Sequence, residues 1–464
     1  MRHTRRHTPM APMASMAPMA WPSSMACVLC MASLALPAAA QDLAPVPRLA
    51  EAADLDPDPA LVQVALTAAE TGDAVFPYSY AGGGVGPVIR VPAGATLAVD
   101  LDNTLPDPTT IHWHGVAVPE SMDGTVWRFD PVGPGERFRY AFPVERPGTF
   151  WYHPHFDTAR QVDGGLFGAL LVDDPAAPAA DDELVLIFDR AMEGHESPGG
   201  AAGHGALMAG WRINGAHAPL AYSARGGTAV RVRLINASSV GYLDLRWPGI
   251  RHIAGDQGFL PALQTPDRVV LGPGDRAEVE WLVGEQGFSV ADHPFSLNGG
   301  STWQSPAELL RVEVSDPAPA PAGLDWPFSG AEPSPDPPYS DIVYVFSGSD
   351  RTGEWFINGE QFPEITVERV SLGSRPIIEV RNHSPVNHPF HIHGNHFEVL
   401  SLDGVRPPYA LYADTVDVPV HGRLRIRLEA DNPGAWMTHC HILPHAEEGM
   451  MTVLEIGDPP GGPE

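Results

Sequence analysis

Cysteine and lysine are scarce in this 464-residue chain. Lysine is absent, and two of the three cysteines, Cys27 and Cys30, lie in the first 40 residues, which leaves Cys440 alone in the remainder. A single cysteine forms no internal disulfide, so disulfide bonds do not stabilise the fold. A lone thiol in an oxidising compartment is a liability unless something, such as a bound metal, protects it.

Positive charge and long apolar runs are scarce as well. The 28 basic residues face 57 acidic ones, and removing the three arginines of residues 1–40 changes the formal charge from −29 to 25 − 57 = −32. Such a charge keeps a protein soluble and repels nucleic acid and anionic lipid. It would also favour cationic substrates, although solvation alone explains it. Beyond residue 40 no segment reaches the roughly 18 apolar residues of a membrane span, and no motif indicates an obligate protein partner.

The first 40 residues have the pattern of an export signal. Three arginines are followed by a short apolar run at residues 25–36 and by three alanines that end at Ala40. We therefore expect a periplasmic or secreted protein. The pair Arg5-Arg6 also fits the twin-arginine route, although a start at a later methionine would remove that pair.

Strand patterns and an internal repeat dominate the rest. Short β-branched runs alternate with Gly and Pro turns, helical periodicity is scarce, and the pattern is typical of β-sandwiches. A similar strand recurs three times, ending at Asn103, Asn236 and Asn382, which lie 133 and 146 residues apart. About 150 residues per domain also predicts roughly three domains. Pro-rich acidic stretches place the domain limits at 41–176, 177–316 and 317–464.

Histidines gather in four short motifs near the two ends. The motifs are His112-Trp-His114, His153-Pro-His155, His388-Pro-Phe-His391-Ile-His393 and His439-Cys440-His441, and the last is followed by His445 and Met450. Successive side chains of a strand point to opposite faces, so the two histidines of each His-x-His triplet face the same way. The same alternation sends Cys440 to the face opposite its two neighbours. One strand could therefore contact two metal sites.

The donor types indicate copper. Cys440, His445 and Met450 supply a thiolate, an imidazole and a weak thioether, and His388 would complete the ligand set of a blue-copper electron-transfer centre. An isolated His-x-His pair is more simply a structural feature, but four pairs, one of which encloses the only remaining cysteine, favour metal. Eight further imidazoles suit a cluster of three coppers: His112, His114, His153, His155, His391, His393, His439 and His441.

The motifs follow the internal repeat. Pro147-Gly148 and Pro433-Gly434 precede triplets at the same interval, 286 residues apart, and the first triplet has Pro154 where the last has Cys440. We expect the three-copper cluster between domains one and three, the blue copper within domain three, and a middle domain that acts as a spacer and helps to wall the substrate site. The scattered histidines of the middle domain are expected to be structural or surface residues: His195, His204, His217 and His252.

The four motifs in this order resemble those of the multicopper oxidases, the family of laccases, ascorbate oxidase, bilirubin oxidase and cuprous oxidases. The resemblance implies an all-β fold of three cupredoxin-like Greek-key β-sandwich domains in tandem, with four coppers per chain. It implies a type 1 copper bound by His388, Cys440, His445 and Met450, with Met451 as the alternative to Met450. It implies a type 2 copper bound by His112 and His391, and a coupled type 3 pair bound by His114, His153, His155, His393, His439 and His441.

The resemblance also implies a laccase-like oxidase with two partners, a small-molecule reducing substrate and dioxygen. Electrons would enter at the type 1 copper, and Cys440 would provide a short bonded route to the type 3 pair, where dioxygen is reduced to water. Methionine as the axial ligand indicates a low to moderate potential and electron-rich substrates such as phenols and aromatic amines.

Two carboxylates are candidate proton donors. Asp123 matches an acidic position of the family, although a turn Asp before Gly124 is the simpler interpretation of that residue. A second family carboxylate corresponds here to Ala446, which makes Glu447 the candidate replacement, with Glu448 behind it.

Two other functions are alternatives. An oxidase of cuprous, ferrous or manganous ions that serves copper tolerance is the second candidate, but seven of the thirteen methionines lie in the first 40 residues and the others form no Met-rich segment. A copper-free envelope protein of the same fold is the third, and the complete set of twelve ligands argues against it.

Overall fold

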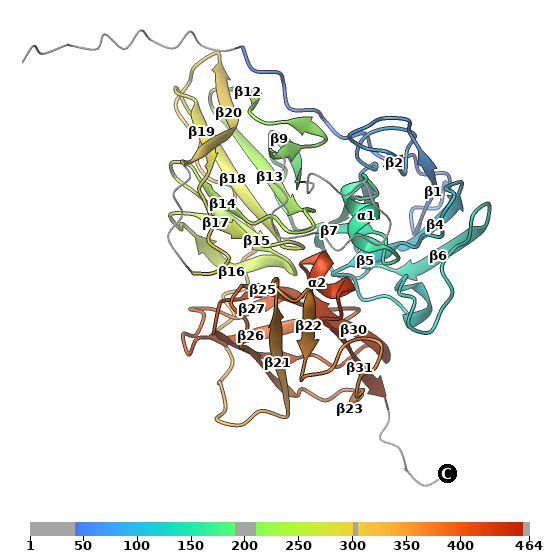
Figure 1. Ribbon diagram of the computed structural model, residues 1–464. Coiled ribbons are helices and arrows are strands. Elements are labelled where there is room, and N and C mark those ends of the chain that lie inside the picture. The colour runs from blue at the N-terminus through green and yellow to red at the C-terminus, as the bar shows by residue number, and fades with distance from the viewer. Residues whose placement is uncertain (1–41, 191–209, 300–304, 458–464) are drawn as a thin grey trace, which may run out of the picture. The chain divides into compact units, whose positions relative to one another are not determined.

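Strands make up most of the described structure. The computed structural model describes residues 42–190, 210–299 and 305–457 (Figure 1). The predicted export signal at residues 1–40, together with His195 and His204, lies outside the described residues. Within them, two short α-helices and one 3-10 helix accompany the strands, which confirms the predicted all-β class.

Two four-stranded sheets form the first sandwich, in the orders β2-β1-β4-β6 and β3-β8-β7-β5. Their strands are β1 (Leu61–Glu70), β2 (Tyr78–Ser79), β3 (Ile89–Pro92), β4 (Thr96–Asn103), β5 (His112–His114), β6 (Arg137–Pro143), β7 (Gly148–His153) and β8 (Gly168–Asp173). The 3-10 helix η1 (Glu120–Met122) and the helix α1 (Thr158–Asp163) lie in its loops.

A seven-stranded and a five-stranded sheet form the second sandwich, in the orders β11-β10-β9-β13-β18-β15-β16 and β12-β20-β19-β14-β17. Their strands are β9 (Asp182–Asp189), β10 (Arg212–Ile213), β11 (Ala216–His217), β12 (Leu220–Arg225), β13 (Thr228–Asn236), β14 (Leu243–Arg246), β15 (His252–Gly255), β16 (Gly258–Gln264), β17 (Val269–Leu271), β18 (Arg276–Val283), β19 (Phe288–Asp292) and β20 (Ala307–Ser315).

A six-stranded and a five-stranded sheet form the third sandwich, in the orders β22-β21-β24-β29-β26-β27 and β23-β31-β30-β25-β28. Their strands are β21 (Ile342–Ser349), β22 (Glu354–Ile357), β23 (Glu368–Ser371), β24 (Ile377–Asn382), β25 (His388–Ile392), β26 (Phe397–Leu402), β27 (Leu411–Ala413), β28 (Thr415–Val418), β29 (Arg423–Leu428), β30 (Gly434–Cys440) and β31 (Met451–Gly457). The short helix α2 (Leu443–Glu447) follows β30 and contacts α1 of the first sandwich (Figure 1).

Each sandwich has its own apolar core, and the side-chain period of two explains why. In β1 the alternate residues Val62, Val64, Leu66 and Ala68 are buried, whereas the residues between them are at least partly exposed. In β7 and β30, by contrast, nearly every residue is buried, because these strands are covered on both faces. The histidine motifs of the outer sandwiches lie on such doubly covered strands.

The three asparagines of the repeated strand occupy equivalent places. Asn103, Asn236 and Asn382 are each fully buried at the end of their strands. In each case the side-chain carbonyl accepts the amide two residues further on, and the side-chain amide donates to a carbonyl of the loop four or five residues further on. These bonds fix the loop that follows the strand. The repeat read from the sequence is therefore a repeat of hydrogen bonds.

The three sandwiches pack tightly enough that residues 43–464 form one unit, so the predicted domain limits stay a prediction. None of the helices within the described residues has the length and apolar character needed to cross a membrane.

Glu183 links the first two sandwiches. Its carboxylate accepts hydrogen bonds from Arg233 of β13 and from Arg90 of β3. Burial alone would raise the pKa of Glu183, but the two guanidinium groups outweigh burial and lower it to about 2. A carboxyl group with a lowered pKa stabilises the fold above its ordinary pKa, and the effect is lost as the pH falls through the folded-state value.

Glu183→Gln should therefore lower the free energy of unfolding by roughly 2 kcal/mol at pH 7. The deficit should shrink between about pH 5 and pH 3, because the wild-type carboxylate begins to protonate there in the unfolded chain. Urea unfolding at pH 7, 5 and 3 measures this. Glu51→Gln, which removes an exposed partner of Arg90, is the control and should change the free energy by less than about 1 kcal/mol. A deficit that does not depend on pH would contradict the prediction.

Candidate metal centres

Two strand pairs bring the histidine motifs together. β5 pairs with β7 so that His112 lies opposite His153. β25 pairs with β30 so that His391 lies opposite His439. The adjoining loops add the remaining members. We call the eight buried imidazoles the histidine cluster: His112, His114, His153, His155, His391, His393, His439 and His441.

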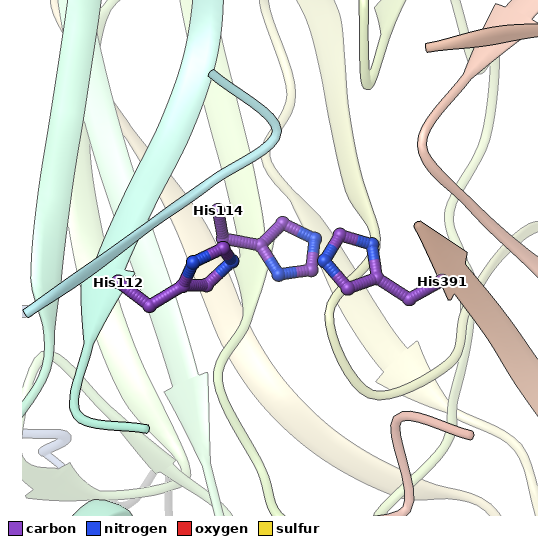
Figure 2. Close-up of side chains that lie close together, drawn as sticks. All are labelled: His112, His114 and His391. Atoms are coloured by element: carbon purple, nitrogen blue, oxygen red, sulfur yellow. The ribbon is translucent and has the colours of Figure 1, made fainter. Parts of the chain in front are cut away.

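The histidine cluster contains three groups of three, two of which share His114. Each group combines residues from both outer sandwiches. In every group the candidate ligand atoms lie within 4.8 Å of one another. The groups are His112, His114 and His391; His114, His153 and His441; and His155, His393 and His439. Figure 2 shows the first of these, in which the ring of His391 approaches His112 and His114 from the opposite side. The structure thus brings all eight predicted histidines together.

The ring nitrogens of the cluster have a common arrangement. One nitrogen is held by a protein oxygen: Nδ1 of His112 donates to the carbonyl of Asp123 at 3.0 Å, and Nδ1 of His391 donates to the carbonyl of Asp414 at 2.9 Å. The other nitrogen points into the cluster. Among the described residues of the histidine cluster, six buried ring nitrogens have no hydrogen-bond partner: Nε2 of His112, Nδ1 of His114, Nε2 of His153, Nε2 of His391, and both nitrogens of His441.

These unpartnered nitrogens fit bound metal ions. A buried polar atom without a partner costs about 1–3 kcal/mol, and native structures contain few of them. In the third group, Nε2 of His439 lies 3.0 Å from Nε2 of His393 and 3.5 Å from Nε2 of His155, so these nitrogens converge as well. Imidazole nitrogens that converge in a buried space are typical of copper or zinc ligands.

Seven of the eight imidazoles have a lowered pKa and are neutral at physiological pH: His114, His153, His155, His391, His393, His439 and His441. Burial, with smaller contributions from neighbouring imidazoles, lowers the pKa of His114, His153 and His391 well below the ordinary value. Burial likewise lowers the pKa of His439 to about 4. A metal ion binds the neutral form of imidazole, so these seven imidazoles need no deprotonation before they bind metal.

Two carboxylates flank the histidine cluster in equivalent ways. Oδ2 of Asp123, just after η1, lies 2.9 Å from Nδ1 of His393. Oδ1 of Asp414, between β27 and β28, lies 3.0 Å from Nε2 of His114. Each residue also offers its backbone carbonyl to a histidine of its own sandwich. Asp123 is therefore more than a turn residue, although Gly124 beside it does require a left-handed backbone (φ +76°) pressed against the carbonyl of Ile111.

Cys440 lies on the other face of β30 with two histidines, and we call these three residues the cysteine site. Its Sγ is 3.3 Å from Nδ1 of His388 and 3.8 Å from Nδ1 of His445, and the two nitrogens are 3.3 Å apart. Burial raises the pKa of the Cys440 thiol, so a cation at this place would favour the thiolate. The thiol and two imidazoles fit a soft metal such as copper.

The structure favours Met450 over Met451 as the neighbour of this site. Met450 is fully buried in the same apolar core as Cys440, and its carbonyl accepts the amide of Cys440 at 3.2 Å. Met451 starts β31 and packs with Trp127 and Phe362 in a different apolar cluster.

Glu447 lies at the end of α2, and its described contacts are with α1. Its Oε1 accepts the amide of Ala159 at 2.9 Å, and burial raises the pKa of its carboxyl group. In the middle sandwich, His217 is exposed on β11 and Nε2 of His252 lies 2.9 Å from the carbonyl of Ala254. Neither joins a candidate metal group within the described part of the chain.

Sequence reasoning missed several residues that contact the metal centres. Ser384 contacts His388, Trp355 stacks on His445 with ring centroids 3.9 Å apart, and Asp414 contacts His114. None of them belongs to a motif. Ser384 does follow the repeated Asn382 by two residues, and this spacing could have identified it.

A cavity of about 500 Å³ lies beside the histidine cluster between the outer sandwiches. Its lining includes Gly115, Glu120, Arg146 and Asn395. Gly115 directly follows His114, and Asn395 lies two residues after His393. A small molecule in this cavity would therefore lie next to residues that adjoin the cluster.

Comparison with known proteins identifies the class. A family profile described as multicopper oxidase matches residues 69–177, and a second with the same description matches residues 334–460. The multicopper oxidase MmcO of Mycobacterium tuberculosis is 30% identical over 452 residues, which cover 87% of this chain and 86% of that protein. The chain therefore belongs to the multicopper oxidase family and is a copper-dependent oxidoreductase with oxygen as the acceptor.

Solved structures have the same fold. A laccase from Pediococcus acidilactici superposes with a TM-score of 0.76 at 25% identity, covering 90% of this chain and 94% of that one. A multicopper oxidase from Campylobacter jejuni, described as a metallo-oxidase, superposes with a TM-score of 0.77 at 23% identity, covering 90% and 96%. The cupredoxin-like architecture predicted from the sequence is thereby confirmed.

The contact between Ser384 and His388 leads to a prediction about copper binding. Oγ of Ser384 lies 2.6 Å from Nε2 of His388 and can accept a hydrogen bond from its N–H. Nδ1 of His388 then has no hydrogen and faces Cys440. Ser384→Ala should weaken copper binding at the cysteine site by about 10–100-fold, because it removes the group that orients a ligand imidazole. Competition with a chelator and the visible copper–thiolate absorption measure this.

Ser238→Ala is the matched control, because Ser238 follows Asn236 in the middle repeat by the same two residues. It should leave both the copper affinity and the visible spectrum unchanged. Equal copper affinity in the two variants would contradict the role assigned to Ser384.

Proposed function

We propose that this protein oxidises small electron-rich molecules at a copper in the cysteine site and reduces dioxygen to water at three coppers in the histidine cluster. The observation that carries the proposal is the segment at residues 439–441. Cys440 faces His388 and His445, whereas His439 and His441 belong to the histidine cluster. One continuous stretch of backbone thus joins the two centres.

The ligand groups support a specific distribution of four coppers. His388, Cys440, His445 and Met450 would hold the type 1 copper. Nε2 of His112 and Nε2 of His391, both without a partner among the described residues, would hold the type 2 copper. Two three-histidine groups would hold the type 3 pair: His114, His153 and His441, and His155, His393 and His439.

Bound copper would supply one-electron redox chemistry at the cysteine site and oxygen reduction at the cluster. The chain itself supplies position and protons. Asp123 lies within hydrogen-bond distance of His393 and can hold a proton at Oδ2 beside the cluster. Glu447 stays the second candidate proton donor, although its contact with Ala159 also fits a role in holding α1 against α2.

The surroundings of His445 support a cationic substrate. Trp355 stacks on the ring of His445 but is itself fully buried, whereas Oδ1 of the half-buried Asp350 lies 3.6 Å from Nε2 of His445. An aromatic amine or a phenol could bind near the Nε2 edge of the His445 ring, and the acidic surface favours a positively charged substrate. We therefore place substituted phenols and aromatic amines first.

Oxidation of cuprous, ferrous or manganous ions is the second candidate function. The carboxylate of Asp350 near His445 favours it as well, and the relative from Campylobacter jejuni is described as a metallo-oxidase. A copper-free envelope protein is not favoured, because all the predicted histidine and cysteine ligands lie in the two centres. We also propose that the protein works in the periplasm or outside the cell, on the basis of residues 1–40.

Turnover of a phenol, an aromatic amine, Cu(I), Fe(II) and Mn(II) by the copper-loaded protein tests the function. The phenol or the amine should have the highest kcat/KM, and the protein should show the strong visible absorption of a copper–thiolate bond. Cys440→Ser should abolish both the absorption and all substrate oxidation, while copper in the histidine cluster largely remains. Unchanged turnover in Cys440→Ser would contradict the proposal, and a preference for a metal ion would favour the second candidate.

Asp123→Asn should slow reoxidation by dioxygen by about 100-fold or more, because the amide keeps the shape but cannot deliver a proton. Reduction by substrate should change little. Stopped-flow measurement of the two half-reactions separates these steps, and equal slowing of both would contradict the assignment. Glu447→Gln, measured in the same way, slows reoxidation only if Glu447 delivers the second proton.

A further inference from the structure

A loop of the middle sandwich reaches the histidine cluster. Residues 272–276 comprise the loop between β17 and β18 together with the first residue of β18. A Cβ added at Gly274 would lie 3.0 Å from Cγ of His441 and 3.1 Å from Cε1 of His114. Such distances are shorter than ordinary contacts of a methyl group, so the backbone of the loop lies directly against these two rings. The middle sandwich, which holds no cluster histidine, therefore contacts two of the predicted copper ligands.

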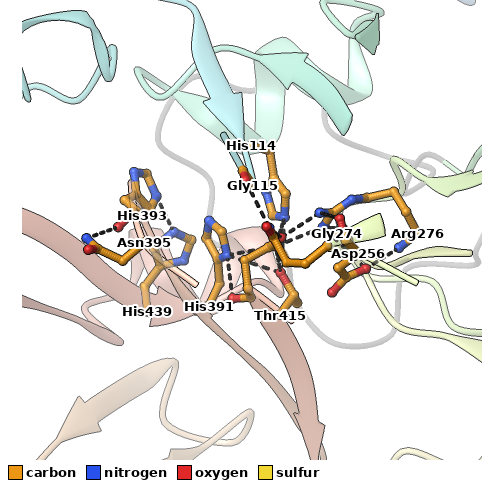
Figure 3. Close-up of polar contacts among 12 residues, drawn as sticks. His114, Gly115, Asp256, Gly274, Arg276, His391, His393, Asn395, Thr415 and His439 are labelled. Carbon is orange, nitrogen blue, oxygen red and sulfur yellow. Dashed lines mark hydrogen bonds and ion pairs between the residues drawn. The ribbon is translucent and has the colours of Figure 1, made fainter. Parts of the chain in front are cut away.

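Arg276 at the end of this loop connects all three sandwiches. Its buried guanidinium makes a bidentate ion pair with Asp414 of the third sandwich, with Nη1 2.8 Å from Oδ1 and Nη2 2.5 Å from Oδ2. Its Nε donates to the carbonyl of Thr149 in the first sandwich at 3.1 Å. Figure 3 shows Arg276, Asp256 and Gly274 on one side of this network and His114 and His391 on the other.

The network ends on copper ligands. Oδ1 of Asp414 lies 3.0 Å from Nε2 of His114. The hydroxyl of Thr415 lies 3.0 Å from Nε2 of His114 and 3.1 Å from Nδ1 of His391. Because these atoms engage Nε2 of His114 and Nδ1 of His391, the opposite nitrogen of each ring points into the cluster.

The network is packed so closely that no side chain larger than hydrogen fits at Gly115. A Cβ at Gly115 would lie 2.5 Å from Nη2 of Arg276 and 2.7 Å from Oδ2 of Asp414. Gln257, in the turn between β15 and β16, donates to Oδ2 of Asp414 at 2.6 Å and to the carbonyl of Gly115 at 2.9 Å. Both oxygens of Asp414 are thus engaged by residues of the middle sandwich.

Asp123 and Asp414 occupy equivalent places but differ in their partners. Each lies beside a histidine of the opposite outer sandwich, and each backbone carbonyl accepts from a histidine of its own. Arg276 pairs with Asp414, whereas no arginine pairs with Asp123 in the described part of the chain. A bidentate guanidinium holds a carboxylate in one orientation.

We infer that the segment at residues 272–276 is a positioning element for the three-copper cluster. Gly274 fixes the position of the rings of His114 and His441. Arg276 acts through Asp414 and fixes the position of the rings of His114 and His391. The inference rests on the proposed function, because it assigns these histidines to copper. It assigns Asp414 the role of orienting the ligand imidazoles. The middle sandwich therefore does more than space the outer two.

Gly274→Ala tests the contact with the rings. Gly274 has φ +92°, and Gly94, with φ +88° and nothing within 4 Å of an added Cβ, has the same backbone strain without the contact. Gly94→Ala is therefore the matched control. Gly274→Ala should weaken copper binding in the cluster by about 10–100-fold and change the type 2 copper signal in electron paramagnetic resonance. Gly94→Ala should change neither, although both variants lose stability.

Arg276→Gln tests the ion pair, with Arg233→Gln as its control. Arg233 is also buried in the middle sandwich and paired with carboxylates, but its partners are Glu183 and Glu278. Arg276→Gln should change the type 2 signal and reduce the copper content of the cluster, and Arg276→Lys should restore part of both. If Arg276→Gln does not fold, Arg276→Lys and Gly274→Ala carry the test, since neither removes a charge.

The outcomes separate this inference from the proposed function. A wild-type protein that binds no copper in the histidine cluster overturns both. The inference alone is overturned if the wild type has normal copper signals and the Gly274 and Arg276 variants match their controls in copper affinity and in resonance spectra. The inference is supported if copper affinity and resonance spectra change only in the Gly274 and Arg276 variants. The visible absorption of the cysteine site should stay unchanged in all the variants.

Discussion

The structure depends on one costly arrangement, the burial of eight imidazoles from two sandwiches in one space. Six of their nitrogens have no partner among the described residues, and each costs about 1–3 kcal/mol. Protonation does not remove this cost. For His114, burial and repulsion from neighbouring imidazoles both disfavour the protonated ring. The apolar cores of the sandwiches must therefore hold the imidazoles in place until metal binds.

The second constraint is the alternation of side chains along β30. Cys440 and its two neighbours point to opposite faces, so a single strand serves two centres that differ in chemistry. The cysteine site is enclosed by aromatic and apolar residues, whereas the histidine cluster is surrounded by backbone carbonyls and two carboxylates. A thiol suits the first environment, and neutral imidazoles with oriented nitrogens suit the second.

The internal repeat explains why the cluster has nearly equivalent halves. Asn103 and Asn382 hold the loops that precede the histidine strands of the first and third copies, and Asp123 and Asp414 each contact a histidine of the other copy. The copies have diverged at single positions, such as Pro154 and Cys440. The middle copy lost the histidines but contacts the cluster through Gly274 and Arg276, both of which lie directly against the outer copies.

The sequence by itself determined the fold class, the repeat and the twelve candidate ligands, because the side-chain period of two and the donor types of His, Cys and Met are local properties. The family resemblance of the motifs also identified Asp123, and the spacing after His445 favoured Met450 over Met451, a choice that the packing of the two residues supports. Asp414, Gly274 and Arg276 carry no local signal, and Ser384 carries only its spacing from Asn382. Only the tertiary structure decided the places of Asp414, Gly274 and Arg276, because each of them contacts a residue of another sandwich that is distant in the chain. Such contacts arise only when the separate sandwiches pack together.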